Sequence, residues 1–163
     1  MEPKRILFVC TGNSCRSVMA QGLLQHRLKQ MEHQLTQPIE VDSAGVFAIQ
    51  GMPPSRETLR LLEQEGVDLS THMAQSVTEE LLRHAHAVFA MEWFHMEEVV
   101  RRLAEAKGKV RLLKPFGLPE GQAIGDPNIG DPIGKPPEVY EQCFSLIRVA
   151  VDRVARAIVD GTL

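Results

Sequence analysis

The chain has 163 residues, a mass of 18.2 kDa and a formal net charge of −3. Hydrophobic residues make up 44% of it, so it can bury a core without a disulfide or a metal ion to hold it together. Its apolar runs are far shorter than the ~20 residues of a membrane-spanning helix. The small negative charge predicts no general attraction to nucleic acid or anionic lipid. Three cysteines and no secretory signal pattern lead us to expect a reduced, cytoplasmic protein.

Short apolar strands alternate with amphipathic helices along the chain. The pattern predicts strands at 6–9, 39–41, 87–91 and 110–113. It predicts helices at 18–31, 53–66, 78–82, 92–106 and 137–159, and a long loop rich in Pro and Gly at 115–137. This alternation indicates βαβ units. We therefore expect an α/β fold, a three-layer α/β/α sandwich with a four-stranded parallel sheet, in one domain over residues 1–163.

The segment from Cys10 to Ser17 follows the first predicted strand, where parallel sheets bind their ligands. Gly12 and Asn13 tolerate positive φ, so the loop can turn successive N–H groups inward as an anion nest. The helix that follows adds its positive N-terminal end, and Arg16 offers two donors to phosphate oxygens. Such a cradle favours the thiolate form of Cys10, which is a nucleophile for phosphorus.

The sequence Val-Cys-Thr-Gly-Asn-Ser-Cys-Arg-Ser at 9–17 resembles the signature loop of the low-molecular-weight protein tyrosine phosphatases. Asp131-Pro132, before the last helix, is similar to the Asp-Pro loop of that family, and 42–45 and 71–72 also match its pattern. The resemblance covers nearly the whole chain. The family includes a bacterial branch of protein arginine phosphatases.

This resemblance implies a two-step phosphatase mechanism without metal or cofactor. Cys10 attacks phosphorus to form a phosphocysteine, and Asp131 protonates the leaving group and then activates water. Arg16 and the loop amides bind the phosphate. Ser17 is expected to hydrogen-bond the Cys10 sulfur, and Ser43 and His72 to brace the loop through Asn13. The phosphate-binding residues implied are Thr11, Gly12, Asn13, Ser14, Cys15, Arg16 and Ser17.

Several single residues have two interpretations. Asp126 also precedes a proline and is a rival for the acid, although its spacing to the last helix favours Asp131. Cys15 is either a redox partner that shelters Cys10 or a small packing residue. Glu92 is either an acidic residue near the site or a helix-start carboxylate.

The remaining nucleophilic and titratable residues are expected to be structural. Cys143 lies on the apolar face of the last predicted helix and is expected in the core. His84, His86 and His95 have no metal-ligand spacing and are expected to be surface or hydrogen-bonded histidines.

Phosphotyrosine is the substrate that the family resemblance implies, with protein phosphoarginine as the alternative. Tyrosine-specific members usually carry aromatic residues after Asp-Pro, where this chain has Ile133 and Gly134, although Phe47 could form one wall. The arginine phosphatase branch is similar at 43–48 and 78–81. That branch has a small polar residue at the position of Ser14, usually Thr, and usually Phe at that of Ile133. The expected partner is a phosphorylated protein, and the expected state a monomer.

Two other functions belong to different classes. Thioredoxin-coupled arsenate reductases share a nearly identical loop, but they need a further cysteine pair, and 91–114 contains none. A phosphate-binding module without catalysis is the second, which the joint presence of Cys10, Arg16 and Asp131 disfavours. Val18 stands where the family usually has Pro, which removes some rigidity but no chemical group.

Overall fold

Four parallel strands lie at the centre of the molecule, in a computed structural model that describes residues 1–163. They are β1 (Lys4–Cys10), β2 (Ile39–Gly45), β3 (Ala87–Ala90) and β4 (Val110–Leu112). Their order across the sheet is β2-β1-β3-β4, and every neighbouring pair is parallel. The predicted four-stranded parallel sheet is therefore confirmed.

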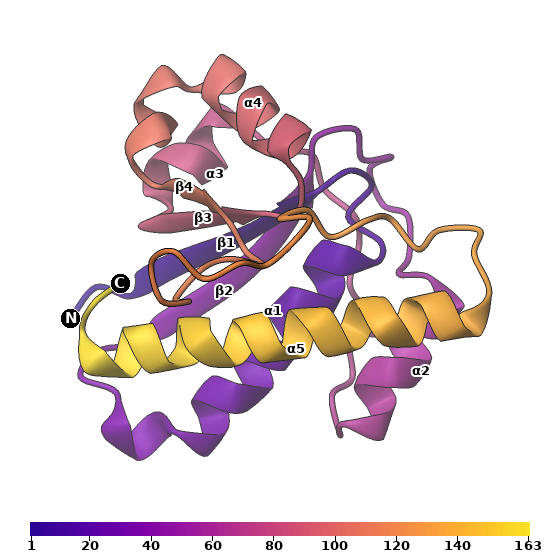
Figure 1. Ribbon diagram of the computed structural model, residues 1–163, viewed down its shortest axis with the longest axis horizontal. Helices are drawn as coiled ribbons and strands as arrows, with labels where there is room; N and C mark the ends of the chain where they lie inside the picture. Colours follow the sequence, from indigo (N-terminus) through magenta and orange to yellow (C-terminus); the bar gives the residue numbers. More distant parts are fainter.

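Helices cover both faces of this sheet, which gives the three predicted layers. On one face lie α1 (Arg16–Gln30), α2 (Arg56–Gln64) and the long α5 (Pro137–Asp160). On the other lie α3 (Glu79–His84) and α4 (Trp93–Arg102) (Figure 1). No helix is long and apolar enough to cross a membrane.

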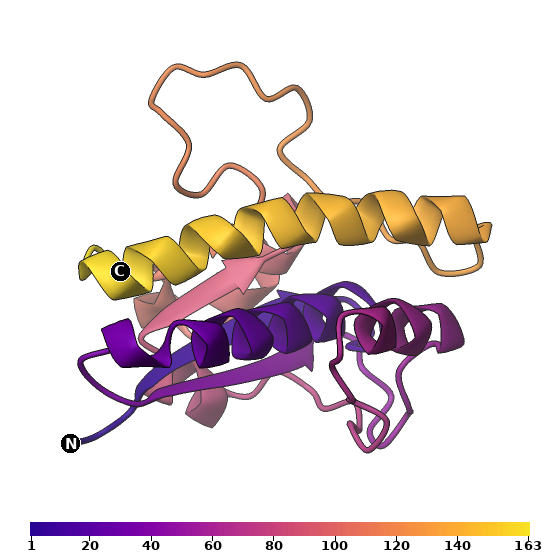
Figure 2. The same cartoon turned by 90° about the horizontal axis from the view of Figure 1, so that it is seen from below.

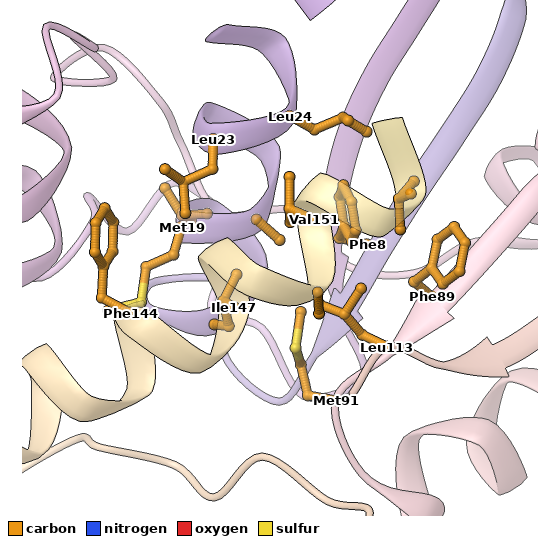
Figure 3. Packing of buried hydrophobic residues seen from close by; sticks show 14 of the residues in the cluster. Phe8, Met19, Leu23, Leu24, Phe89, Met91, Leu113, Phe144, Ile147 and Val151 are labelled. Atoms are coloured by element: carbon orange, nitrogen blue, oxygen red, sulfur yellow. The ribbon is translucent and has the colours of Figure 1, made fainter. Parts of the chain in front are cut away.

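The side chains of β1 alternate between two hydrophobic cores because successive residues of a strand point to opposite faces. Ile6 and Phe8 face the larger core, under α1 and α5, while Leu7 and Val9 face the smaller one, under α3 and α4. Figure 3 shows Phe8 in the larger core with side chains of α1 and α5. Cys10 continues the face of Phe8, so the last residue of a central strand places its thiol on the side from which α1 begins.

The helix predicted at 92–106 is shorter than expected. It ends at Arg102, Leu103 is extended (φ −148°, ψ 103°), and a 3₁₀ turn follows over Ala104–Gly108. This break lets Leu103 and Ala106 both stay buried in the smaller core. The Arg102 side chain meanwhile donates to the Val46 and Val77 carbonyls, which ties the helix end to the loops beside it.

The Pro- and Gly-rich stretch between β4 and α5 forms the predicted long loop. Figure 2 shows its first part swinging out past α5 before it returns to the sheet. Arg153 of α5 anchors its start by donating to the carbonyls of Lys114 and Phe116. The loop then passes the carboxyl edge of the sheet, where the Ile129 N–H donates to the Met91 carbonyl. Its last residues therefore lie beside the end of β1.

Candidate active site

The loop between β1 and α1 turns on Asn13, the one non-glycine residue of the chain with positive φ (55°). Its buried amide makes four hydrogen bonds. Nδ2 donates to the hydroxyls of Ser17 (2.8 Å) and Ser43 (2.9 Å). Oδ1 accepts from His72 Nε2 (3.2 Å) and from the Gln75 N–H (3.0 Å). Every donor and acceptor of the amide is used, so the strained backbone conformation is held from three directions.

The Cys10 sulfur receives two hydrogen bonds from this braced loop. The Ser17 hydroxyl lies 2.9 Å from Sγ, and the Asn13 N–H donates to Sγ at 3.3 Å. Because Ser17 Oγ already accepts from the Asn13 amide, its own hydrogen is available to the sulfur. Donors aimed at a sulfur atom stabilise its anionic form.

The guanidinium of Arg16 is held at the mouth of the same loop, although its side chain is only 1% exposed. Nη1 donates to Glu92 Oε2 and to the Ile129 carbonyl (2.7 Å). Nη2 donates to Thr11 Oγ1 (3.3 Å) and lies 3.6 Å from Asp131 Oδ2. These contacts fix the orientation of the buried guanidinium.

These groups line one small pocket of about 220 Å³. It contains the predicted nucleophile Cys10, the predicted phosphate-binding residue Arg16 and the predicted acid Asp131. The residues that line it are Cys10, Thr11, Gly12, Ser14, Cys15, Arg16, Asp131 and Ile133. A larger hollow of about 580 Å³ lies between β2 and α3, but it has no cysteine and no anion cradle. We therefore take the small pocket as the candidate active site.

Asp126 and Asp131, which both precede a proline, have different surroundings. Asp131 lines the pocket and contacts Arg16. Asp126 instead accepts from the backbone and side-chain N–H groups of Asn128 (both 2.9 Å), and these bonds lower its pKa. Asn128 in turn accepts from the Trp93 N–H (2.8 Å), which ties the loop to the start of α4. Asp126 therefore shapes the loop that carries Asp131.

All three cysteines are free thiols. Cys15 donates to Ser55 Oγ (3.3 Å) and lies 4.0 Å from the Tyr140 hydroxyl, so it packs between α2 and α5. Burial raises the pKa of Tyr140. Cys143 lies in the larger core, as predicted, where burial raises its pKa to about 12. A regulatory disulfide between Cys10 and Cys15 stays a prediction.

At the start of α4, sequence reasoning offered Glu92 as an acidic residue near the site but did not foresee the contribution of His95. Glu92 contacts Arg16 directly, and His95, expected only to be a surface or hydrogen-bonded histidine, is completely buried against Thr11. The available signal was their spacing. An acidic residue followed three positions later by a polar one, directly after a buried strand, is typical of a helix start at the carboxyl edge of a sheet.

A free cysteine at a strand end, in a braced loop beside a buried arginine, is an arrangement suited to nucleophilic attack on a phosphoryl group. The similarity of the whole chain to known proteins agrees with this chemistry. Residues 5–161 match the family described as low molecular weight phosphotyrosine protein phosphatase. The chain belongs to this family and is a phosphatase acting on phosphoproteins.

Similar proteins carry two substrate names. A protein-arginine-phosphatase of Geobacillus stearothermophilus is 38% identical, over 96% of this chain and 97% of that protein. The solved YwlE arginine phosphatase of the same organism has a TM-score of 0.81, with 38% identity over 96% of this chain and 93% of that one. A low molecular weight protein tyrosine phosphatase from T. tengcongensis has a TM-score of 0.82, with 37% identity over 94% and 98% of the two chains.

Proposed function

We propose that Cys10, Arg16 and Asp131 carry out hydrolysis in two steps. The Cys10 thiolate attacks phosphorus, the bond from phosphorus to the leaving group breaks, and Asp131 gives the leaving group a proton. The carboxylate of Asp131 then removes a proton from water as the water attacks the phosphocysteine. Inorganic phosphate leaves and the thiolate is restored.

The contacts within the site support these roles. The two donors on the Cys10 sulfur stabilise the nucleophilic thiolate in the first step and the thiolate leaving group in the second. The fixed Arg16 guanidinium and the loop N–H groups face the charge that develops on the equatorial oxygens. Phosphate binding by 11–17 and bracing by Ser43 and His72 belong to the same proposal.

We propose protein phosphoarginine as the substrate, and one observation carries this choice: no aromatic side chain lines the pocket. A phenyl ring needs apolar walls, whereas a guanidinium needs hydrogen-bond acceptors along its edge. Ser14 and Asp131 offer such acceptors, and the small Ser14 leaves room for a planar, branched group. The name of the G. stearothermophilus relative points the same way.

Phosphotyrosine is the second candidate because an aromatic residue lies next to the loop. The Phe47 N–H donates to the Thr11 carbonyl (2.9 Å), and the residue is 62% exposed. Its ring is available to cover one face of a tyrosine ring. The name of the T. tengcongensis structure supports this candidate.

The deciding experiment measures phosphate release from a phosphoarginine peptide and from a phosphotyrosine peptide of the same sequence, without added metal. We expect the higher kcat/KM for phosphoarginine; a preference for phosphotyrosine would reject our substrate choice. Cys10→Ser should abolish release from both peptides, with Cys143→Ser as the control outside the pocket. Release by Cys10→Ser would reject the thiolate mechanism, and phosphate binding without any turnover would favour a binding module.

We further propose that the protein works as a monomer in the cytoplasm. A thiolate nucleophile needs a reducing compartment. Size-exclusion chromatography with light scattering tests the monomer, and fractionation of the source cells tests the compartment.

Arsenate reduction is disfavoured because Cys143, buried with a raised pKa, is poorly suited to relay electrons from Cys10.

A further inference from the structure

His95 connects the first turn of α4 to the loop that holds Cys10. The Glu92 N–H donates to His95 Nδ1 (3.0 Å), so this nitrogen carries no proton. In a neutral imidazole the proton is then on Nε2, which lies 2.9 Å from Thr11 Oγ1. The ring therefore donates to the Thr11 hydroxyl, and the start of α4 fixes the tautomer that allows it.

The Thr11 hydroxyl receives a second hydrogen bond, from Arg16 Nη2 (3.3 Å). A hydroxyl oxygen has two acceptor sites and one hydrogen. With both acceptor sites filled, Thr11 can act toward the pocket, which it lines, only as a donor. An incoming phosphate oxygen needs a donor of this kind.

Arg16 is thus held by α4 on both of its terminal nitrogens. Glu92 accepts directly from Nη1, and His95 acts on Nη2 through Thr11. Burial, with a smaller contribution from the Arg16 charge, lowers the pKa of His95 to about 3. The ring is therefore neutral at physiological pH and places no second positive charge beside the guanidinium.

We propose that His95 is a positioning residue for the phosphatase reaction, which sets the donor direction of the Thr11 hydroxyl and the orientation of Arg16. This inference rests on the proposed function. It concerns a contact with the loop side chain of Thr11, and it assigns His95 no proton transfer and no contact with substrate.

Two substitutions test the hydrogen bonds of the two ring nitrogens one at a time. Asn places an oxygen where His95 has Nδ1, so His95→Asn keeps the acceptor for the Glu92 N–H and loses the donor to Thr11. Gln places an amide nitrogen near the position of Nε2, so His95→Gln keeps that donor and loses the acceptor. We expect His95→Asn to lower kcat/KM for an aryl phosphate about tenfold or more, and His95→Gln to retain most of it. The reverse order would overturn the proposal, because it would mean that capping of α4 is what matters.

A double-mutant cycle with Thr11→Val supplies the readout that a purely structural role would not change. If His95 acts through Thr11, adding His95→Asn to Thr11→Val costs little further activity. Independent, multiplied losses would overturn the proposal. Phe94→Leu is the matched packing control, since the Phe94 ring lies 4.2 Å from the imidazole and belongs to no part of the site. We expect it to leave kcat/KM unchanged.

Calorimetry of inorganic phosphate binding to the same variants tests the positioning role of His95 independently of whether the protein hydrolyses either peptide. His95→Asn and Thr11→Val should both weaken phosphate binding, Thr11→Val at least as much as His95→Asn, whether or not a given peptide is hydrolysed. Unchanged phosphate binding in both variants would overturn the positioning role. Failure of the wild type to hydrolyse either peptide would instead count against the proposed function.

Discussion

Asn13 illustrates how a single residue determines the shape of the phosphate loop, residues 10–17. The sequence indicates that both Gly12 and Asn13 could take positive φ, but only Asn13 does so. The difference is in the side chain, because an amide can be fixed by neighbours and a glycine cannot. Its partners come from the first turn of α1, four residues away, and from β2 and the segment around His72, which are both distant in sequence. Local sequence suggests the turn, whereas tertiary contacts decide which residue makes it.

Substitution of the two aspartates separates the acid from the turn residue. Asp131→Asn keeps the shape of the side chain but cannot give a proton, so we expect kcat on a substrate with a poor leaving group to fall about a hundredfold or more. Asp126→Asn should change kcat little, because an amide oxygen can still accept from the Asn128 N–H. Steady-state kinetics on a series of leaving groups checks this. A larger loss for Asp126→Asn would assign the acid role to Asp126.

Ser14→Ile tests the residue that we link to substrate choice. Ile removes a hydroxyl acceptor and adds an apolar wall, which disfavours a guanidinium and favours a phenyl ring. We expect the ratio of kcat/KM for phosphoarginine over phosphotyrosine peptides to fall about tenfold or more. Ser145→Ile, on the exposed side of α5, is the control for an added apolar side chain. An unchanged ratio would remove Ser14 from the explanation of specificity.

Between elements, the close approach of β2 to the phosphate loop depends on Gly45. A Cβ atom added there would lie 2.4 Å from the Thr11 carbonyl oxygen and 3.0 Å from the Asn13 nitrogen. Backbone must move to admit it, so we expect Gly45→Ala to cost about 1–3 kcal/mol of unfolding free energy and much of the activity. Gly108→Ala, where nothing lies within 4 Å, is the control. Urea unfolding measures the loss of stability, and steady-state kinetics measures the loss of activity. If Gly45→Ala and Gly108→Ala lost the same stability and activity, this explanation would be contradicted.

Helices and strands were predictable where a few consecutive residues are enough to indicate them. The run from Ile6 to Val9 has no polar residue and indicates a buried strand, and the helix predicted from residue 78 begins where Thr78 caps α3 by accepting from the Leu81 N–H. The first turn of α4 was only partly predictable. Its contacts with Arg16 and Thr11 depend on β1 and β3 lying side by side, and no spacing within 92–95 encodes that neighbour.

For the whole molecule, the parallel sheet explains why distant segments meet at one site. The carboxyl ends of β1, β2 and β3 lie at the same edge, so the segments after them converge: the phosphate loop, the loop after Gly45 and the start of α4. The long loop before α5 returns to this edge through the bond from Ile129 to Met91 and brings Asp131 with it. The reacting groups therefore depend on the integrity of the entire fold.

The buried His95 should make the stability of the whole molecule depend on pH. An unfolded chain protonates an ordinary histidine near pH 6.5, whereas the pKa of His95 in the fold is about 3. Between these values the unfolded state binds one more proton, so its free energy falls relative to the native state as pH decreases. We expect His95 to remove up to about 1.4 kcal/mol of unfolding free energy per pH unit across this window. Above pH 6.5 its contribution is constant.

Urea unfolding from pH 7 to pH 3.5 of the wild type and His95→Gln tests this. Glutamine does not titrate, so the variant should lose stability less steeply with acid, whatever its stability at pH 7. His84→Gln, at the exposed end of α3, is the control and should follow the wild-type slope. Parallel curves for the wild type and His95→Gln would mean that His95 is protonated in the folded protein. A protonated ring would have no acceptor for the Glu92 N–H, so parallel curves would also contradict the hydrogen bond that ties His95 to the start of α4.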